Sequence, residues 1–526
     1  MTHNIIQSVN PATLEVIGEV KSTHKSDIEK IVKTARKAFP VWSKRKRSER
    51  SKILRNAQQL LLKEQEAFAR LITLEMGRPL VESYVIELEA SIDLIGYYAD
   101  RVHRFLKDRP VPLHNLFFKR RKSKIHFQPL GVLGIITPWN WPLLIPLGSI
   151  VPALLSGNTV VFKPSELTPL VGQKMGELFW NAGVPEESFQ VIQGKGDVGQ
   201  GLVQSEVEKV FFTGSTQVGQ KVMQQAAHSL KKVVLEMGGN DPAIVCEDAD
   251  IDTCTSGILW GGFNNCGQNC NAIERVYVHQ NIFNEFIEHL VPKIEKLRIG
   301  NGLDMNTDVG PLASKMQLHK MKSLMARANR KRANSCFGGH PIQNQKGYFF
   351  EPTVILWKNN THNLFDEEIF GPIIVVTPVE NDQQAIQLAN QSQYGLAASV
   401  WTSNLRHGEW IAKQLETGSV MVNDSVVSFG MTEANWTGIK NSGIGWMHGE
   451  KGLDEMVNIQ YINEDQQLHS HKFWWFPYEE HMIHGLKAGI RLLFDRRIWI
   501  KIRALPKAVS YFWKYLLCNS KHKGKI

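Results

Sequence analysis

Residues 209–214 read Lys209-Val210-Phe211-Phe212-Thr213-Gly214, a short apolar run that stops at a threonine and a glycine. Helical segments separate this run from others that also stop in polar or Gly/Pro-containing stretches, at residues 132–136, 159–164 and 232–236. Such alternation of short buried strands with helices predicts a parallel sheet that is covered on both faces. Ligands of these sheets bind beyond the carboxyl ends of the strands, so we expect a binding site where the runs end.

The same alternation resumes after residue 243, where residues 275–278 and 373–376 are candidate strands. Helical periodicity marks residues 26–75, ahead of the first sheet. With 526 residues, the chain exceeds the roughly 100–200 residues of one typical domain. The sequence therefore predicts an α/β protein with two α/β units.

The chemistry is concentrated in the run Phe263-Asn264-Asn265-Cys266-Gly267-Gln268-Asn269-Cys270, which follows Leu235-Glu236-Met237-Gly238-Gly239. A cysteine can act as a covalent nucleophile, and a glutamate can activate water to release what the cysteine has captured. Taken alone, Cys270 could equally be a buried structural thiol, and Glu236 could cap a turn. Cys266 and Cys270 lack a second Cys/His pair with ligand spacing, so we expect no metal centre.

Over residues 8–463 the chain resembles the aldehyde dehydrogenase superfamily, because several motifs occur in the order found there. These motifs are Asn10-Pro11-Ala12-Thr13, Pro138-Trp139-Asn140-Trp141-Pro142, Lys163-Pro164-Ser165-Glu166, Phe212-Thr213-Gly214-Ser215, Glu236, Cys270, Glu367-Glu368-Ile369-Phe370-Gly371-Pro372 and Tyr394-Gly395-Leu396. The resemblance implies a Rossmann-like cofactor domain, a second α/β catalytic domain and a small β element for oligomerisation. It assigns residues 1–120 and 130–243 to the first, 244–425 to the second, and strands at 121–129 and 455–463 to the third.

The resemblance also implies the catalytic roles. Cys270 attacks the aldehyde, Asn140 and the Cys270 N–H stabilise the resulting oxyanion, and Glu236 activates the water that hydrolyses the thioester. Relatives that transfer the acyl group to coenzyme A do not need this base, so Glu236 favours water as the acceptor.

The cofactor implied by the resemblance is NAD. The residues expected around it are Ile136, Thr137, Pro138, Trp139, Lys163, Glu166, Gly196, Phe212, Gly214, Ser215, Val218, Met237, Gly238, Glu368 and Phe370. Residues 214–219 are not the common G-x-G-x-x-G fingerprint, but they offer a glycine turn before a helix N-terminus, where N–H groups can meet phosphate. Glu166 would bond the ribose hydroxyls and repel a 2′-phosphate, so NAD is preferred to NADP.

The sequence departs from the family at residues 435–443, where Trp436 and Thr437 replace the phenylalanine and glycine of the usual Pro-Phe-Gly-Gly. This loop lines the substrate entrance in relatives. The rest of the body looks most similar to bacterial members that act on apolar aldehydes, such as diapolycopene-dialdehyde dehydrogenases. We therefore expect an apolar or long-chain aldehyde as substrate.

Charge separates the body from the C-terminal tail. Residues 466–526 hold eight Lys and four Arg against three acidic residues, whereas the whole chain has a net charge of +10. A near-neutral body argues against a nucleic-acid binder. The tail combines the basic residues with an aromatic cluster at residues 473–476 and a helical apolar face at residues 482–494. It predicts a peripheral anchor on an anionic membrane, and packing on the same or a neighbouring subunit is the alternative.

Six dispersed cysteines and the lack of an export signal at the start of the sequence predict a reducing cytoplasm, with the tail on the inner membrane face. A strand at residues 457–462 predicts, by resemblance, a homodimer or tetramer. Two other readings of function stay open: a catalytically retired dehydrogenase fold that serves as a membrane scaffold, and a coenzyme A-acylating enzyme of the same fold. The intact set of Cys270, Glu236, Asn140, Lys163 and Glu368 counts against the scaffold.

Overall fold

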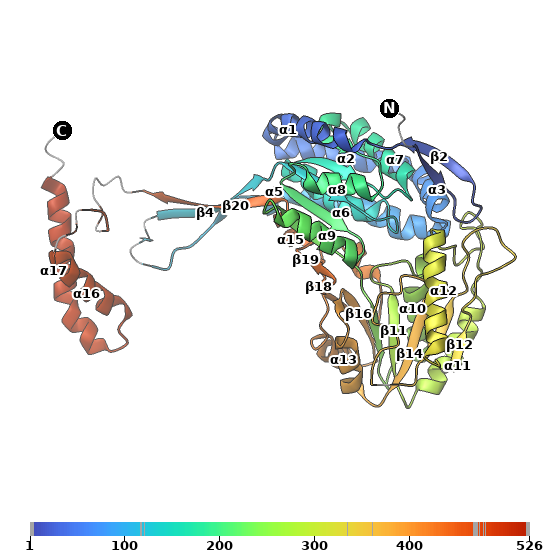
Figure 1. Cartoon of the computed structure of the whole chain (residues 1–526). Helices are drawn as coiled ribbons and strands as arrows, with labels where there is room; N and C mark the ends of the chain where they lie inside the picture. Colours follow the sequence, from blue (N-terminus) through green and yellow to red (C-terminus); the bar gives the residue numbers. More distant parts are fainter. Residues whose placement is uncertain are drawn as a thin grey trace. The chain divides into compact units, whose positions relative to one another are not determined.

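Two large sheets form the core of one unit of the chain, and a helical hairpin dominates the other (Figure 1). The first unit is Met1–Lys107 with Phe127–Ile459, and the second is Asp108–His126 with Gln460–Ile526. The structure is a computed structural model that describes residues 5–115, 118–119, 121–333, 335–359, 361–466, 472, 474–476, 478 and 480–521.

The first sheet of the larger unit has the order β19-β9-β8-β5-β6-β7. Its strands are β5 (Val132–Ile136), β6 (Thr159–Lys163), β7 (Phe189–Val191), β8 (Lys209–Thr213), β9 (Lys232–Glu236) and β19 (Gly443–Ile444). β5 to β9 are parallel, and β19 runs antiparallel to β9. β5, β6 and β8 are buried along their whole length, as their unbroken apolar runs predicted.

Helices cover this sheet. α1 (Ile28–Lys44), α8 (Gly196–Gln204) and α9 (Thr216–Ala227) share one hydrophobic cluster with its strands. α6 (Leu144–Ser156) and α7 (Pro169–Ala182) also pack against its strands. The other helices of this half are η1 (Lys25–Asp27), α2 (Arg47–Lys63), α3 (Gln65–Met76), α4 (Leu80–Glu82), η2 (Ser83–Glu89), α5 (Ala90–Phe105), η4 (Glu186–Ser188) and α15 (Gly449–Asp454).

The second sheet has the order β12-β13-β14-β11-β10-β16-β17. Its strands are β10 (Asp241–Val245), β11 (Ile273–His279), β12 (Ser335–Phe337), β13 (Thr353–Leu356), β14 (Ile373–Val379), β16 (Ala397–Trp401) and β17 (Ser419–Val422). All are parallel except β12. The expected domain boundary at residues 243/244 falls inside β10, which belongs wholly to this sheet.

The helices of the second sheet divide between its faces. α10 (Ile251–Phe263), α11 (Phe283–Glu295) and α12 (Lys315–Arg330) share one hydrophobic cluster with the strands. α13 (Asp382–Asn390) and α14 (Leu405–Ala412) share another. The remaining elements are η5 (Asn264–Gly267), η6 (Val427–Gly430), the pair β15 (Tyr394–Gly395) with β18 (Ile439–Lys440), and the pair β1 (Ile5–Val9) with β2 (Val16–Lys21).

A three-stranded sheet of order β20-β4-β3 joins the two segments of the smaller unit. Its strands are β3 (Arg109–Pro110), β4 (Arg121–Pro129) and β20 (Val457–Asp465). Within the unit, Arg121 pairs with Asp465, and the Tyr461 hydroxyl donates to Ser123 over 2.9 Å. β4 has the expected limits 121–129, whereas β20 begins and ends two residues later than the expected 455–463. The two strands pair with each other, and their role in oligomerisation stays a prediction.

The rest of the smaller unit is a hairpin of α16 (Glu480–Phe494) and α17 (Ile498–Lys521). The helices pack closely where α16 carries Gly485, because a Cβ at this glycine would overlap the Tyr511 ring of α17. The helix expected over residues 482–494 is confirmed, and the apolar segments after it belong to one further helix. Phe473 of the predicted aromatic cluster lies outside the described residues.

Candidate functional site

Cys270 and Glu236 are brought together by the ends of different elements. Glu236 is the last residue of β9 and is buried. Cys270 follows α10 and the turn η5, in which Asn265 and Cys266 adopt positive φ angles of 48° and 57°. This left-handed turn lets the chain leave α10 and return toward β9, so that the thiol meets the carboxylate.

Burial dominates the electrostatics of this pair. It raises the pKa of Glu236 to about 8, with the charge of Glu368 adding to the rise. Three hydrogen-bond donors oppose this rise in the pKa by favouring the carboxylate form: the Cys270 thiol, the Trp436 indole N–H and the Thr213 hydroxyl. Burial and then the negative charge of Glu236 hold the pKa of Cys270 well above that of an ordinary thiol. The pair is therefore a thiol beside a carboxyl group that can take the thiol proton once it is ionised, near pH 8 and above.

The Glu236 carboxylate is close to its partners but loosely held. Among the described residues, neither of its oxygens closes a hydrogen bond of full geometry, and the Trp436 N–H is likewise left over. Buried polar groups are normally bonded. A carboxylate without tight bonds can turn from the thiol toward a water, which suits a group that must serve both.

Asn140 lies in the loop after β5 and is buried. Its backbone carbonyl accepts from the Arg78 guanidinium and, over 3.2 Å, from the side chain of Asn265. Its side-chain oxygen has no partner among the described residues. The loop of Cys270 thus holds Asn140 by its backbone and leaves the side-chain amide for a ligand.

Buried charges underlie this arrangement, and sequence reasoning missed them. Arg78 is fully buried, lies 3.5 Å from Glu87 and stacks on the Trp141 ring at 4.3 Å. Glu82 accepts from the N–H of Asn265 at 3.0 Å. No spacing signal connects residues 78–87 to the turn at residue 265, so only the fold reveals that they support the loop of Cys270.

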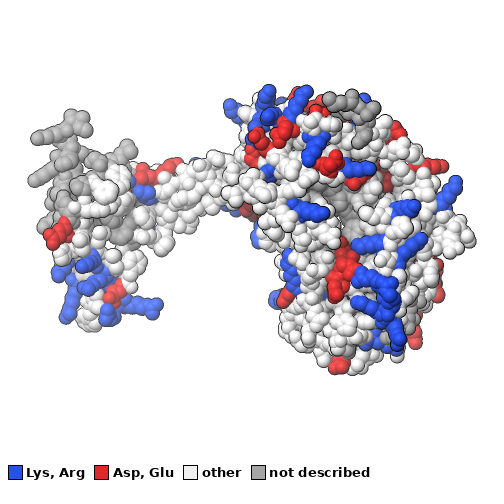
Figure 2. All heavy atoms as spheres, viewed as in Figure 1, with Lys and Arg blue, Asp and Glu red and all other residues white. Residues whose placement is uncertain are grey.

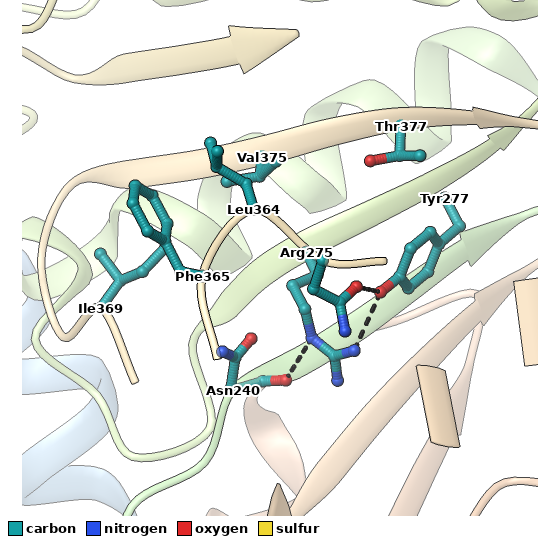
Figure 3. A pocket seen from close by; sticks show the side chains of 9 residues that line it. Asn240, Arg275, Tyr277, Leu364, Phe365, Ile369, Val375 and Thr377 are labelled. Atoms are coloured by element: carbon teal, nitrogen blue, oxygen red, sulfur yellow. Dashed lines mark hydrogen bonds between the residues drawn. The ribbon is translucent and has the colours of Figure 1, made fainter. Parts of the chain in front are cut away.

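A second network fixes the chain between Glu236 and β10 (Figure 3). The Arg275 Nε donates to the carbonyl of Asn240 over 2.8 Å, and its Nη1 donates to Tyr277 over 2.9 Å. The Tyr277 hydroxyl donates in turn to Asn363. The Asn240 side chain donates to the carbonyl of Glu367 over 3.0 Å, which ties this loop to the segment that carries Glu368.

That segment lies against Glu236 and Cys270. Glu368 accepts from the Gly239 N–H at 3.2 Å, and its charge raises the pKa of both Glu236 and Cys270. Phe370 has a φ of 53° and meets Trp139 edge-on, with ring centroids 5.5 Å apart. At Gly238 a side chain would overlap Glu368.

Several further residues of the predicted cofactor set lie at the carboxyl end of the first sheet. Lys163 ends β6, donates to the Pro164 carbonyl over 2.9 Å and lies 3.6 Å from Glu166. Ser215 precedes α9 and makes no capping bond with its side chain. A Cβ added at Gly196 would meet open space. This edge of the sheet thus combines the Lys163 cation, the Glu166 carboxyl group and the uncapped N-terminus of α9. Such a set fits the phosphates and ribose hydroxyls of a dinucleotide.

Other members of the predicted set occupy different places. Ile136, Phe212 and Met237 belong to the hydrophobic cluster between the first sheet and its helices, where Gly219 abuts Met237. Thr137 follows β5 and has a buried hydroxyl without a partner among the described residues, whereas Val218 is exposed on α9. Pro138 and Gly214 lie in the loops after β5 and β8, and their contact with a cofactor stays a prediction.

Trp436 is the residue whose position the sequence did not predict. In the sequence it marks a departure from the family at the substrate entrance. In the structure it is buried beside Glu236, and Phe429 packs edge-on against it with ring centroids 5.3 Å apart. A phenylalanine at this position has no N–H to offer the carboxylate.

Known proteins share this architecture. The model of the aldehyde dehydrogenase family matches residues 1–462. The chain is 37% identical to the mitochondrial succinate-semialdehyde dehydrogenase of Oryza sativa subsp. japonica, covering 87% of this chain and 86% of the relative. It is 36% identical to the chloroplastic betaine aldehyde dehydrogenase of Beta vulgaris, covering 88% and 93%. A crystal structure of Staphylococcus aureus betaine aldehyde dehydrogenase with NAD+ superposes with a TM-score of 0.85 at 35% identity, covering 90% of this chain and 94% of that one.

Proposed function

Because the chain belongs to the aldehyde dehydrogenase family, we propose that it oxidises an aldehyde to the carboxylic acid with NAD+ as the hydride acceptor. The observation that carries the proposal is the contact between the Cys270 thiol and the Glu236 carboxylate. It places a nucleophile and a base together, as covalent catalysis requires. The balanced reaction consumes aldehyde, NAD+ and water and yields acid, NADH and a proton.

The first step is attack by sulfur on the aldehyde carbon. Glu236 takes the thiol proton, because its own raised pKa makes it a base matched to neutral or mildly alkaline solution. The oxygen of the adduct becomes negative. The side-chain amide of Asn140 and the backbone N–H of Cys270 stabilise it, a type of contact worth roughly 2.7–4 kcal/mol in other enzymes.

Bound NAD+ supplies the hydride acceptor, and loss of hydride from the adduct leaves an acyl thioester on Cys270. Lys163 and Glu166 would hold the ribose hydroxyls, with the acid disfavouring a 2′-phosphate. The uncapped N-terminus of α9 would receive a phosphate, and Glu368 would hold the nicotinamide ribose with Phe370 packed nearby. Once Glu236 has released the thiol proton to solvent, it takes a proton from water, and the hydroxide attacks the thioester. The acid leaves, and the proton on Glu236 passes to the Cys270 sulfur and restores the thiol.

Replacing Cys270 by alanine tests this mechanism, with Cys254→Ala as the matched control. Both thiols are in the second α/β part, and Cys254 is buried in α10. We expect NADH formation to disappear in the first variant and to persist in the second. Turnover by Cys270→Ala at the unmodified rate would refute the mechanism. An acyl-CoA product would instead favour the coenzyme A-acylating alternative, and NAD binding without turnover of any aldehyde would favour the scaffold.

We further propose that the substrate is an apolar aldehyde. The ionisable groups that act on Cys270 are the carboxyl groups of Glu236, Asp241 and Glu368, whose ionised forms disfavour an aldehyde that carries a carboxylate. Trp436 and Phe429 supply aromatic surface next to Glu236. An aromatic and acidic surrounding also suits a cation, so the assay must separate an apolar substrate from a quaternary ammonium one.

The assay compares kcat/KM for straight-chain aldehydes of increasing length, succinate semialdehyde and betaine aldehyde. Each buried CH₂ contributes about 0.8 kcal/mol, so we expect kcat/KM to rise up to about fourfold per added carbon. A maximum at betaine aldehyde or at succinate semialdehyde would exclude an apolar substrate while leaving aldehyde oxidation intact.

The hairpin of α16 and α17 supports a second proposal, binding to an anionic membrane surface. Along α17, Ile498, Ile502, Leu505, Val509 and Trp513 recur at helical spacing and are all exposed. Lys and Arg side chains gather on the same hairpin (Figure 2). Among the described residues, no helix is both long and apolar enough to span a bilayer. Exposed apolar stripes with flanking cations favour the interface of an anionic bilayer.

Sedimentation with phosphatidylserine-containing vesicles tests membrane binding. Ile498 and Trp499 of α17 are 62% and 75% exposed, and Leu405 and Met316 of the larger unit are 67% and 70% exposed. We expect glutamate at the first pair to abolish sedimentation and glutamate at the second pair to leave it unchanged. Equal binding by both double variants would exclude the hairpin as the anchor.

Association into a homodimer or tetramer is proposed through β20. This strand is an edge of its sheet, and Ile459 and Tyr461 on it are exposed. Open apolar edges commonly pair with another chain. Light scattering should give at least twice the chain mass of 59.6 kDa, and a lysine at position 459 should lower it.

A further inference from the structure

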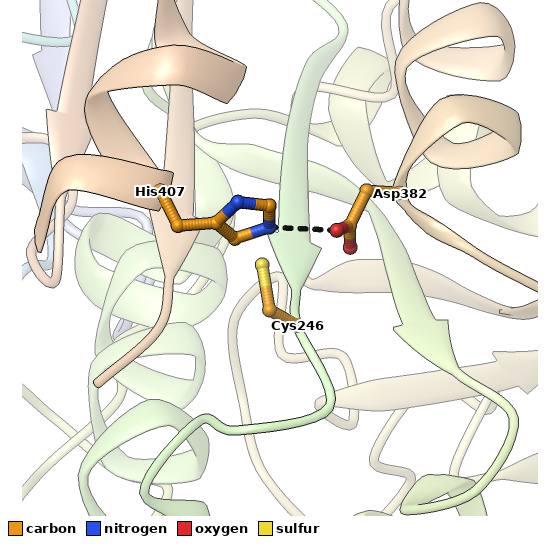
Figure 4. Close-up of side chains that lie close together, drawn as sticks. All are labelled: Cys246, Asp382 and His407. Carbon is orange, nitrogen blue, oxygen red and sulfur yellow. Dashed lines mark hydrogen bonds and ion pairs between the residues drawn. The ribbon is translucent and has the colours of Figure 1, made fainter. Parts of the chain in front are cut away.

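We propose that Cys246, Asp382 and His407 form a binding site for a transition-metal dication of the zinc type. Their ligand atoms, a sulfur, a carboxylate oxygen and an imidazole nitrogen, all lie within 4.8 Å of one another (Figure 4). These are the ligand types that Zn²⁺ accepts, at about 2.0–2.3 Å each. Three protein ligands with a water in a fourth position make a complete tetrahedral set.

The topology of the second sheet explains why these residues meet. Cys246 directly follows β10, and His407 lies on α14, which follows the neighbouring strand β16. Asp382 begins α13, which leads from β14 toward β16. All three are thus beyond the carboxyl ends of parallel strands. α10 follows β10 on one face of the sheet, whereas α14 follows β16 on the other face. The strand order therefore reverses between the neighbouring strands β10 and β16. Open α/β sheets bind ligands at such a reversal.

Strand alternation directs the thiol into this crevice. Ala243 and Val245 belong to the cluster with α10, whereas Ile244 and Cys246 belong to the cluster with α13 and α14. Cys246 is buried, but the side chains of His407 and Asp382 keep 34% and 27% of their surface exposed. The site therefore combines one ligand fixed from the core with two that are reachable from solvent.

The metal-free cluster is already connected. His407 Nε2 lies 2.7 Å from the Asp382 carboxylate, and the Cys246 thiol also interacts with that carboxylate. Trp410 stacks on the imidazole at 5.5 Å with a 15° angle between the rings, which fixes its plane. A second carboxylate, Asp248, is engaged by the hydroxyl of Thr402 at 2.7 Å. The metal would replace the thiol proton, so that Cys–SH and M²⁺ give the metal thiolate and H⁺.

This cluster is separate from the catalytic pair. Gly239, just before β10, abuts the carbonyl of Cys270, whereas Cys246 follows the other end of the strand. Five strand residues at about 3.3 Å each separate the two ends by roughly 17 Å. A metal here would join the end of β10 to the first turns of α13 and α14, and it would not contact the aldehyde.

Titration with Co²⁺ tests the proposal, because a cobalt–thiolate bond gives a charge-transfer absorption and tetrahedral coordination gives intense visible bands. The full-length Cys270→Ser protein removes the catalytic thiol as a competing ligand. We expect one equivalent of Co²⁺ to develop both signals and Zn²⁺ to displace it. Absence of a thiolate signal at saturating Co²⁺ would overturn the proposal.

Variants assign the signal to the cluster. Added to the Cys270→Ser protein, Cys246→Ser and His407→Gln should each remove the thiolate signal, and the buried control Cys254→Ser should retain it. Asp382→Asn keeps the size of the side chain and should weaken binding at least tenfold without unfolding the protein. A signal that survives Cys246→Ser, or that Cys254→Ser removes, would place the metal elsewhere and overturn the assignment.

Discussion

The two cysteines at opposite ends of β10 differ in what surrounds them rather than in their own chemistry. Both thiols are near a carboxylate, and burial and that negative charge raise the pKa of each. Beside Cys270, the Glu236 carboxyl group has no hydrogen bond of full geometry among the described residues, and the other ionisable neighbours of the thiol are carboxyl groups. Beside Cys246 the carboxylate is bonded to an imidazole. A loosely held base suits proton transfer, whereas a thiol, carboxylate and imidazole fixed together suit a metal.

The supports of the two sites differ as well. The loop of Cys270 is irregular and depends on buried charges, with Arg78 and Glu87 wholly out of solvent. Cys246 continues a regular strand, and the ion pair beside it is partly exposed. Buried charges that are costly to disturb hold the proposed catalytic site at one end, and ordinary strand pairing holds the opposite end.

The largest effect should come from Glu236→Gln. Removing a general base typically costs about 10²–10⁴-fold in rate. Because Glu236 is the base in both steps, we expect the first NADH per active site to form more slowly than in the unmodified protein, and the turnover that follows to be slower still. Rapid-mixing absorbance at 340 nm measures both phases. The control is Glu247→Gln, which changes an exposed carboxylate after β10. A normal steady-state rate in Glu236→Gln would exclude Glu236 as the general base.

Arg78→Met should be the most destabilising change near the nucleophile loop. It leaves Glu82 and Glu87 buried without their counter-charge, which costs about 3–5 kcal/mol. Arg298→Met removes an ion pair with Asp308 that solvent screens, and should change stability little. Urea unfolding of both variants measures the difference, and similar midpoints would mean that the buried pair does not support this loop.

The pH profile of thioester hydrolysis should follow Glu236. Only the carboxylate can accept a proton from water, and its pKa is raised to about 8. We therefore expect the hydrolysis rate to rise about tenfold per pH unit below this value and to level off above it. Single-turnover measurements in deuterated and ordinary water report the rate of thioester hydrolysis. A rate that stays constant between pH 6 and pH 9 would contradict the role of Glu236 in this step.

Trp436→Phe should shift that profile to higher pH. The indole N–H favours the charged form of Glu236, so its loss raises the pKa of the carboxylate. The plateau rate should be nearly unchanged, because phenylalanine fills most of the same space. Trp410→Phe removes an exposed indole that stacks on His407 rather than lying beside Glu236, and it should leave the midpoint in place. An unmoved midpoint in Trp436→Phe would mean that the indole does not act on Glu236.

The smallest effect contrasts the two thiols directly. Zn²⁺ at one equivalent should slow alkylation of Cys246 by iodoacetamide and leave the half-buried Cys270 labelled at nearly its original rate. Peptide mass spectrometry after brief labelling measures both residues in one sample. If Zn²⁺ protected both thiols equally from iodoacetamide, or protected Cys270 alone, Cys246 would not be the metal-binding thiol.

The sequence predicted the strands that carry the site because their apolar runs are short and bounded by glycine or proline. β5 and β9 have the predicted limits, and β6 and β8 end one residue earlier. Cys270 and Glu236 were found because each is embedded in a local motif. The buried Arg78 and Glu87 and the cluster at Cys246 were not found, because their members lie far apart in sequence without regular spacing. Trp436 was noticed as an unusual residue, but its contact with Glu236 depends on β19 joining β9.

The pairing of β4 with β20 has a consequence for synthesis of the chain. Residues 121–129 leave the ribosome more than 300 residues before residues 457–465. At about 5–20 residues per second, the edge of β4 that β20 later covers waits roughly 15–70 s for its partner. Arg121, Lys122 and Lys124 on β4 carry charges of one sign, which discourage pairing between nascent chains. The same three cations therefore protect the strand during translation, before any of the finished protein exists.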